Sequence, residues 1–199
     1  MANLSISLVK DSDAIPILEI YQPIVERTAI TMEYIAPSLV SIKKRVVEAL
    51  DLWPWLVFRV DEALAGYAYA GAYRQRPGYK WCTELSVYVD SGHHKKGIAT
   101  ALYTSLIAIL NIQGYRNAYA GITLPNPTSV SFHQSMGFKH IGTYQKVGYK
   151  HGKWHDVGWW ALTIQDHPVD PELPLPISKL KDTQIFNEAI NAGLHLVKL

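Results

Sequence analysis

The chain has 199 residues, 48% of them hydrophobic and 18% charged, which is typical of a globular protein and excludes a disordered one. The formal net charge of +2 gives no clustered basic composition, so we expect no nucleic-acid partner. The single Cys82 excludes a disulfide within the chain and a cysteine-based zinc site. Without a signal-peptide pattern or an apolar run of membrane-spanning length, the sequence predicts a soluble cytoplasmic protein with no membrane partner.

The first quarter of the chain predicts one strand and two helices. Residues 4–10 alternate apolar and polar side chains, as a half-buried strand does. The next segment opens with Asp and Ser residues suited to capping and has helical apolar spacing, and Pro23 is expected to end or kink this helix. A second helix is expected over residues 38–50, with Ser38 as its N-cap.

Strands dominate the middle of the chain. The segments "PWLVFRV" and "ALAGYAYAGAYRQ", on either side of Asp61-Glu62, predict a hairpin, and "WCTELSVYVD" predicts a further strand. The clearest helix is "GIATALYTSLIAILNIQG", with Gly114 as its C-cap. The strand "YRNAYAGITL" follows, and this strand–helix–strand crossover predicts a parallel pair of strands.

The remaining segments complete a mixed α/β domain, expected to span residues 1–165. A short helix is expected between Asn126, its cap, and Gly137, and two strands around the turn "KHGK" follow it. From residue 166 the chain is rich in proline, and it then shows a short amphipathic pattern over residues 182–194. We expect residues 166–199 to be an extension, a surface linker or strap that ends in a short helix.

The segment "VDSGHHKKGIATALY" joins a predicted strand to the clearest helix. A helix N-terminus presents unpaired N–H groups and the positive end of the helix dipole, so it binds anions. Gly97 and Ala99 are small enough for a phosphate to approach the backbone, and Lys95 and Lys96 add positive charge. The segment predicts a pyrophosphate-binding loop; the alternative is a solvated basic turn. Its adjacent histidines do not share a helix face and no third ligand stands nearby, so we expect no metal site.

Two segments in this order, "ELSVYVDSGHHKKGIATALY" and "LPNPTSVSFHQSMGF", resemble the acetyl-CoA-binding core of the GNAT superfamily of N-acetyltransferases. The loop of that family reads Gln/Arg-x-x-Gly-x-Gly/Ala, and the run from His94 to Ala99 matches it except that His94 replaces Gln or Arg. The segments "WLVFRVDEALAGYAYAGAYRQRPGYKWCTELSVYV" and "VGYKHGKWHDVGWWAL" are similar to the phosphinothricin and methionine sulfoximine acetyltransferase branch. The resemblance spans most of residues 5–165 and does not cover the proline-rich tail.

The resemblance implies a fold and an activity. The fold is a mixed central sheet of about seven strands, flanked by helices and splayed at the acetyl-CoA site. The activity is transfer of acetyl from acetyl-CoA to the amino group of a small amino-acid-like substrate, carried out by a homodimer. The residues expected to contact acetyl-CoA are Val87, Tyr88, Val89, His94, Lys95, Lys96, Gly97, Ile98, Ala99, Thr100, Asn126 and Ser129.

Two side chains are candidates for proton transfer. A carboxylate that is partly buried beside apolar neighbours has a raised pKa and accepts a proton from an attacking amine, directly or through water, which makes Glu84 the candidate base. The alternative for Glu84 is a strand-end ion pair. His133 is the candidate acid for the departing thiolate, because imidazole titrates near neutral pH; alternatively it only contacts acetyl-CoA. Asn126 has a pantetheine contact implied by the resemblance, and a plain helix N-cap explains it equally well.

The loop "YRQRPGYKW" lies just before the strand of the candidate base and is the candidate acceptor site. Arginine binds a carboxylate or phosphinate through two parallel hydrogen bonds. The residues expected to contact the acceptor are Arg74, Arg76, Tyr79, Trp81 and Thr31. The last of these lies in a segment that closes the acceptor pocket in related enzymes. The alternatives are a solvated hairpin end for this loop, another acceptor such as a polyamine, a protein N-terminus or a lysine, or a non-catalytic acyl-CoA sensor.

Overall fold

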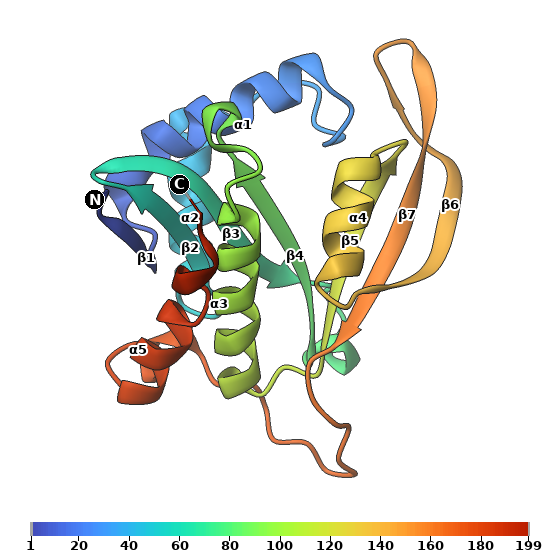
Figure 1. The fold of residues 1–199 in the computed structure, drawn as a ribbon. Helices are drawn as coiled ribbons and strands as arrows, with labels where there is room; N and C mark the ends of the chain where they lie inside the picture. Colours follow the sequence, from blue (N-terminus) through green and yellow to red (C-terminus); the bar gives the residue numbers. More distant parts are fainter. Residues whose placement is uncertain (1, 199) are drawn as a thin grey trace.

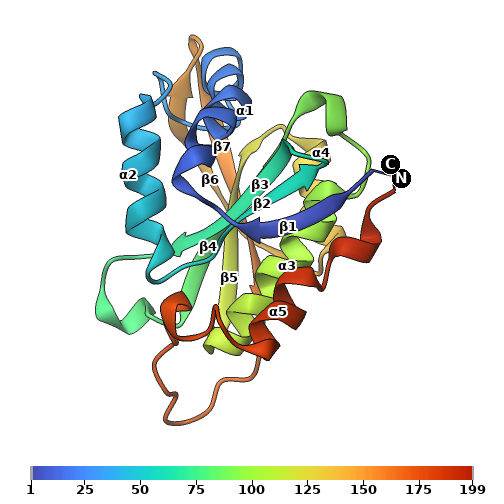
Figure 2. The same cartoon turned by 90° about the vertical axis from the view of Figure 1, so that its left-hand side faces the viewer.

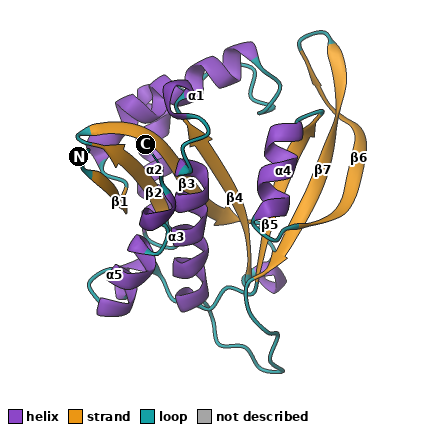
Figure 3. Ribbon diagram, viewed as in Figure 1, coloured by secondary structure: helices purple, strands orange, loops and turns teal. Residues whose placement is uncertain are grey.

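Seven strands form one sheet, in the order β1-β2-β3-β4-β5-β7-β6, in the computed structural model (Figures 1 and 3). The structure describes residues 2–198, apart from the side chains of residues 49 and 50. Every neighbouring pair of strands is antiparallel except β4 and β5, which confirms the predicted mixed fold with one parallel pair. The strands are β1 (Leu4–Leu8), β2 (Trp55–Val60), β3 (Ala63–Ala72), β4 (Cys82–Val89), β5 (Asn117–Leu124), β6 (Lys139–Lys150) and β7 (Lys153–Thr163).

Helices cover both faces of the sheet (Figures 1 and 2). One apolar cluster joins the sheet to α1 and α2, and another joins its opposite face to α3 and α5. The helices are α1 (Ala14–Arg27), α2 (Leu39–Leu50), α3 (Ile98–Gln113), α4 (Pro127–Ser135) and α5 (Gln184–Asn191). None of the helices formed by the described residues has both the length and the apolar character needed to cross a membrane.

The helix α3 is the centre of the larger cluster. The apolar stripe expected from the sequence is buried, with Ile98, Leu102, Leu106 and Leu110 no more than 1% exposed. Burial of each such side chain contributes roughly 1.5–3 kcal/mol. Gly114 ends the helix with φ of 94°, as expected of a glycine C-cap.

Pro23 was expected to end or kink the first helix. It does not end the helix, because α1 continues to Arg27. Proline removes one backbone hydrogen bond inside a helix, which is unfavourable. The buried side chains of Ile17, Tyr21 and Val25 lie before and after Pro23 on the face that packs on the sheet, and this packing holds the helix together. Asp13 precedes α1 without capping it, since its carboxylate accepts instead from the Lys10 N–H at 2.8 Å.

The strands β4 and β5 pair over only three residues and then diverge. The pairs are Cys82 with Asn117, Thr83 with Ala118 and Glu84 with Tyr119. From Leu85 onward the backbone of β4 has no partner in β5, and the two strands separate toward their C-terminal ends. This confirms the splayed sheet, and Figure 1 shows α3 and α4 on either side of the opening.

The proline-rich tail, expected to be a surface linker or strap, lies against the chain's own helices and strands. Leu175 fixes it to the end of α3, because the Leu175 N–H donates to Gln113 O at 2.7 Å and the Gln113 amide donates back to Leu175 O at 2.7 Å. Ile177 is 1% exposed, and α5 packs on α3 and β1. The helix expected over residues 182–194 is shorter in the structure, where α5 ends at Asn191. It starts at Gln184 because the Thr183 hydroxyl caps it by accepting from Phe186 N–H at 3.3 Å.

Candidate active site

Glu84 lies at the point where β4 and β5 separate. It is the last β4 residue paired with β5, opposite Tyr119, and on its other side it pairs with Gly71 of β3. Because side chains alternate along a strand, Glu84 shares a sheet face with Ser86 and Tyr88, the face covered by α1 and α2. The fold therefore places one carboxyl at the closed end of the opening.

The surroundings of Glu84 raise its pKa, as the sequence predicted. Burial of the carboxyl is the main cause, and the positive charge of Arg74 partly offsets it. No ion pair formed within residues 2–198 involves Glu84, so the expected alternative of a strand-end ion pair is not found. A carboxylate whose pKa is raised is a stronger base than an exposed one, which suits proton abstraction.

A cavity of about 70 Å³ occupies the opening beside Glu84. Backbone and side chains of both diverging strands line it, together with polar groups of α3 and α4. The unpaired edge of β4 offers backbone hydrogen-bonding groups to a chain-like ligand in this gap. The lining residues are Ile30, Leu85, Ser86, Val87, Tyr88, Tyr103, Ala120, Gly121, Ile122, Thr123, Asn126, Ser129 and His133.

The predicted anion site lies at the N-terminus of α3, where the backbone leaves N–H groups without helical partners. Gly97 takes φ of 84°, and the first helical hydrogen bond runs from Ala101 N–H to Gly97 O at 2.9 Å. The N–H groups of Ile98, Ala99 and Thr100 precede that bond and have no intrahelical acceptor. These N–H groups and the helix dipole together suit a pyrophosphate.

The loop before α3 is held by its own contacts. The His94 ring lies 3.0 Å from Val89 O through Nε2, and the Lys96 ammonium donates to Gly92 O at 3.1 Å. His94 replaces the Gln or Arg of the family pattern, and the hydrogen bond of its side chain to the end of β4 holds the loop in place. Lys95 takes φ of 61°, which lets the chain turn before α3.

The structure gives another reason for glycine at position 97 than the one expected from the sequence. A Cβ at Gly97 would lie 2.6 Å from the carbonyl oxygen of Leu196, in the C-terminal tail. The missing side chain thus leaves room for the tail, and the positive φ independently favours glycine.

A buried polar chain of three residues borders the opening. His133 is 5% exposed, its Nδ1 lies 2.8 Å from Ser129 O and its Nε2 lies 3.2 Å from the Tyr103 hydroxyl. Since a carbonyl only accepts, Nδ1 carries the proton, and Nε2 accepts from Tyr103. Burial lowers the pKa of His133, so the ring is neutral at neutral pH. The pKa of Tyr103 is raised by burial, so its hydroxyl keeps its proton.

Asn126 caps α4, as the sequence predicted. Its Oδ1 accepts from Ser129 N–H at 3.1 Å, and both residues line the cavity between the strands. The cap uses only the side-chain oxygen, so the amide N–H groups of Asn126 remain for a ligand.

The acceptor loop gathers part of the predicted set over Glu84. Tyr73 stacks on Tyr119, the sheet partner of Glu84, with ring centroids 4.2 Å apart. The Arg74 guanidinium lies over the Tyr73 ring at 4.7 Å and 5.8 Å from the Trp159 ring. These contacts place a cation and an aromatic wall beside the candidate base.

The other predicted acceptor residues of this loop have different surroundings. Tyr79 joins the wall by an edge contact with Tyr73, with centroids 6.0 Å apart. Arg76 is exposed, and Trp81 Nε1 donates to Glu172 O of the tail at 2.7 Å. The structure therefore brings Arg74 and Tyr79 to the same ring, that of Tyr73, with Arg74 close enough to shift the pKa of Glu84, but directs the Trp81 N–H to the tail.

The segment that contains Thr31 is held over the sheet by neighbouring elements. The Thr31 hydroxyl lies 3.1 Å from the Tyr21 hydroxyl, and the buried Lys150 of β6 donates to the carbonyls of Val25 and Thr31 at 2.7 and 2.8 Å. The carboxylate of Glu33 accepts from both guanidinium NH groups of Arg45 at 2.8 and 3.3 Å. The loop after α1 is thus fixed from α2 and from the β6–β7 hairpin.

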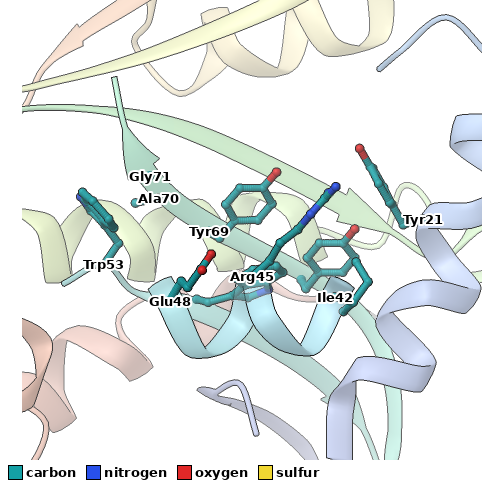
Figure 4. A pocket seen from close by; sticks show the side chains of 10 residues that line it. Tyr21, Ile42, Arg45, Glu48, Trp53, Tyr69, Ala70 and Gly71 are labelled. Carbon is teal, nitrogen blue, oxygen red and sulfur yellow. The ribbon is translucent and has the colours of Figure 1, made fainter. Parts of the chain in front are cut away.

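A second cavity, of about 260 Å³, lies under α2 and ends beside the candidate base (Figure 4). Gly71 belongs to its lining and pairs with Glu84 across the sheet. Figure 4 shows Arg45 and Glu48 of α2 beside Tyr69, with Trp53 near Gly71 at one end. The full lining is Tyr21, Ile42, Arg45, Glu48, Trp53, Trp55, Tyr67, Tyr69, Ala70 and Gly71.

Sequence reasoning missed the aromatic side chains that complete the site. Tyr119 lies opposite Glu84, and Trp159 lies beside Tyr73 and Arg74, only through the pairing of β5 with its neighbours, which single-strand patterns do not show. Tyr103 had a signal, because it is a hydroxyl-bearing residue next to the buried stripe of α3. Tyr73 had one too, since it directly precedes Arg74 in the loop.

Comparison with known proteins agrees with this geometry. Residues 6–159 match the family model described as an acetyltransferase (GNAT) domain. A phosphinothricin N-acetyltransferase of Streptomyces viridochromogenes is 43% identical over 130 residues, which cover 65% of this chain and 70% of that protein. An L-methionine sulfoximine/L-methionine sulfone acetyltransferase of Salmonella typhimurium is 31% identical over 168 residues, covering 82% and 96%.

A solved structure supports the same assignment. The phosphinothricin acetyltransferase of Sinorhizobium meliloti, in complex with acetyl-CoA, superposes with a TM-score of 0.80 at 29% identity and covers 86% of this chain and 93% of its own. The family resemblance expected from the sequence is thereby confirmed, and the chain belongs to the GNAT family of acetyltransferases.

Proposed function

We propose that the chain transfers the acetyl group of acetyl-CoA to the amino group of a small amino-acid-like acceptor of the phosphinothricin or methionine sulfoximine type, with Glu84 as general base. The position of Glu84 carries the proposal. It is the last β4 residue paired with β5, so its carboxyl stands at the point where an acyl chain lying in the gap is proposed to meet the amine of the acceptor. The names of the relatives support the acceptor class.

The donor site fits acetyl-CoA in two places. The cavity between the strands is lined on one side by the unpaired β4 edge and suits the pantetheine arm and thioester. The first turn of α3 presents N–H groups to an anion, which suits the pyrophosphate. Backbone N–H groups near Ser86 and Val87 are proposed to polarise the thioester carbonyl.

The reaction needs one proton removed and one thiolate released. The neutral amine attacks the thioester carbon, the new C–N bond forms, and the C–S bond breaks with the electron pair leaving on sulfur. Glu84 takes the proton that the nitrogen loses, directly or through a water molecule. Proton removal of this kind contributes about 10²–10⁴-fold to the rate.

Arg74 is the proposed anchor for the acidic group of the acceptor. It lies between Tyr73 and Trp159, beside Glu84, and its guanidinium suits a carboxylate or phosphinate. The cavity under α2, which ends at Gly71, suits the apolar part of the acceptor side chain.

Tyr103 and His133 are proposed to shape the thioester site without donating a proton. Replacement of Tyr103 by Phe is expected to lower kcat by less than about tenfold, because burial raises the pKa of the Tyr103 hydroxyl, which weakens it as a proton donor, and lowers the pKa of His133, which disfavours its protonated form. It should lower the free energy of unfolding by about 1–3 kcal/mol, because His133 Nε2 loses its buried partner. Steady-state kinetics and chemical denaturation measure both effects. A loss of about 10²-fold or more in kcat would assign proton donation to this pair.

A homodimer is part of the proposal. The edge strand β6 and its neighbour β7 expose several large apolar side chains, which marks an interaction surface. They are Ile141, Tyr144, Val147, Tyr149 and Trp154. Light scattering of the purified chain should give twice its monomer mass, and a monomer would contradict this part.

The unpaired thiol of Cys82 fits the expected cytoplasmic location.

A screen of acceptors tests the proposed function. The chain is mixed with acetyl-CoA and a series of amines, and thiol release is followed. Phosphinothricin, methionine sulfoximine and methionine sulfone are expected to give the highest kcat/KM, with polyamines and a lysine peptide as comparisons. Higher turnover of a polyamine or a peptide would overturn the acceptor class. Binding of acetyl-CoA without turnover of any amine would favour the non-catalytic sensor.

A further inference from the structure

The last residues of the tail lie on the first two turns of α3, at the expected pyrophosphate site. Figures 1 and 2 show the end of the chain beside the loop that leads into α3. The family match ends at residue 159, so this contact belongs to the part of the chain that the match does not cover. We call residues 193–198 the clamp.

Two contacts join Gly193, at the start of the clamp, to α3. Gly193 N–H donates to the buried hydroxyl of Ser105 at 3.1 Å. A Cβ at Gly193 would lie 2.0 Å from Ala101 O, so the two backbones pass in direct contact. These contacts fix the clamp to the first and second turns of the helix, on the side that faces away from α4 (Figure 1).

Two further contacts reach the anion loop itself. Lys198 N–H donates to Lys96 O at 3.0 Å. The carbonyl oxygen of Leu196 lies 2.6 Å from the position that a Cβ on Gly97 would take. Lys96 and Gly97 are the residues that set the direction of the first N–H groups of α3.

The clamp is held by a separate anchor. Phe186, Ala189 and Ile190 of α5 are at most 8% exposed and belong to the same apolar cluster as α3, and Leu194 and Val197 pack against that cluster. The anchor lies before the clamp in the chain, so α5 can stay docked when the clamp is changed.

We propose that the clamp is a positioning element of the acetyl-CoA site. It holds the carbonyl of Lys96 and the backbone of Gly97, so that the N–H groups of the first turn of α3 are ordered before the pyrophosphate arrives. Binding then orders fewer groups, which favours affinity. The inference rests on the proposed function in its choice of ligand, and it gives residues 166–199 a role in binding.

A pair of substitutions at one position tests the hydrogen bond. Proline at 198 removes the N–H that bonds Lys96 O, and Val197, with φ of −82° and ψ of 134°, already has the conformation favoured before proline. Lys198→Ala keeps the N–H and removes only the charge. We expect Lys198→Pro to raise the Kd for acetyl-CoA about tenfold, with kcat changed less than about twofold and Lys198→Ala close to the unaltered chain. Equal effects of the two substitutions would overturn the positioning role.

A second test uses glycine and a shortened chain. Gly97→Ala should raise the Kd for acetyl-CoA in the full chain, through both its φ and its conflict with Leu196. Gly152→Ala is the matched control, because Gly152 has φ of 76° and open space around its Cβ position. In a chain ending at Gly193, we expect weaker acetyl-CoA binding and a smaller further effect of Gly97→Ala. An unchanged Kd in the shortened chain would overturn the inference.

Calorimetry with acetyl-CoA separates this inference from the proposed function. If the unaltered chain does not bind acetyl-CoA, the proposed function fails. If it binds and all clamp variants bind equally well, only the role of the clamp fails. The expected result is binding by the unaltered chain and a selective loss of affinity in Lys198→Pro and in the shortened chain.

Discussion

Replacing Glu84 by Gln is expected to lower kcat/KM for the acceptor about 10²–10⁴-fold, with the Kd for acetyl-CoA changed less than about twofold. Glutamine keeps the size of the side chain and removes the base. The carboxyl stands at the end of the opening and takes no part in an ion pair among the described residues, so its loss removes no structural ion pair. Thiol release with a reactive acceptor measures the effect.

The pH profile gives the same residue a second test. The base works only when ionised, so kcat/KM should fall as the pH drops through the pKa of Glu84. Burial raises that pKa above the ordinary value of 4.5, so the acidic limb should lie at higher pH than for an exposed glutamate. Glu62→Gln, in the exposed β2–β3 turn, is the matched control and should keep both the rate and the limb. A limb that persists in Glu84→Gln would contradict the assignment.

Stability should move in the opposite direction from activity. A carboxyl whose folded-state pKa is raised destabilises the fold where it is ionised, above that pKa, and has no such effect below the pKa of the unfolded chain. Glu84→Gln should therefore stabilise the chain at neutral pH, and this gain should vanish in acid. Thermal denaturation across pH measures it, and a fall in Tm at neutral pH would oppose the account.

Replacing Arg74 by Gln is the second large expected effect. A charge-assisted hydrogen bond contributes about 1.5–3 kcal/mol, so kcat/KM for an acidic acceptor should fall roughly 10–150-fold, mainly through KM. The positive charge of Arg74 lowers the pKa of Glu84, so its removal should also shift the acidic limb to higher pH. Steady-state kinetics across pH records both changes.

Arg76→Gln separates the two arginines of the loop. Arg76 is exposed and is not among the groups that shift the pKa of Glu84, so the limb should stay in place in this variant. A larger rise of the acceptor KM in Arg76→Gln than in Arg74→Gln would move the anchor to Arg76.

The order and type of the elements could be predicted because local patterns determine them. The stripe of α3, its glycine cap and the hairpin at Asp61-Glu62 follow from residues close in sequence. The prediction that the first helix ends at Pro23 was wrong, because tertiary packing on both sides of Pro23 outweighs one lost hydrogen bond. The course of the tail depends on Gln113 and Ser105, buried polar groups of α3 whose partners lie far along the chain.

The candidate site was predictable where one segment carries it. Glu84 and the loop before α3 lie on consecutive elements, and the resemblance aligned both. The aromatic wall comes from the loop after β3 and from β5 and β7, so Tyr119 meets Tyr73 and Trp159 meets Arg74 only after the sheet has formed. The room that Gly97 leaves for the tail could not be predicted from local sequence either, because Leu196 lies far from Gly97 along the chain.

The proposed role of Glu84 is to remove the amine proton during acetyl transfer. A single-turnover measurement tests it most directly: the chain is saturated with acetyl-CoA, mixed rapidly with methionine sulfone at neutral pH, and the acetylated product is quantified over time. We predict that the single-turnover rate falls about 10²–10⁴-fold in Glu84→Gln while acetyl-CoA stays bound. Equal rates in the two chains would contradict the claim.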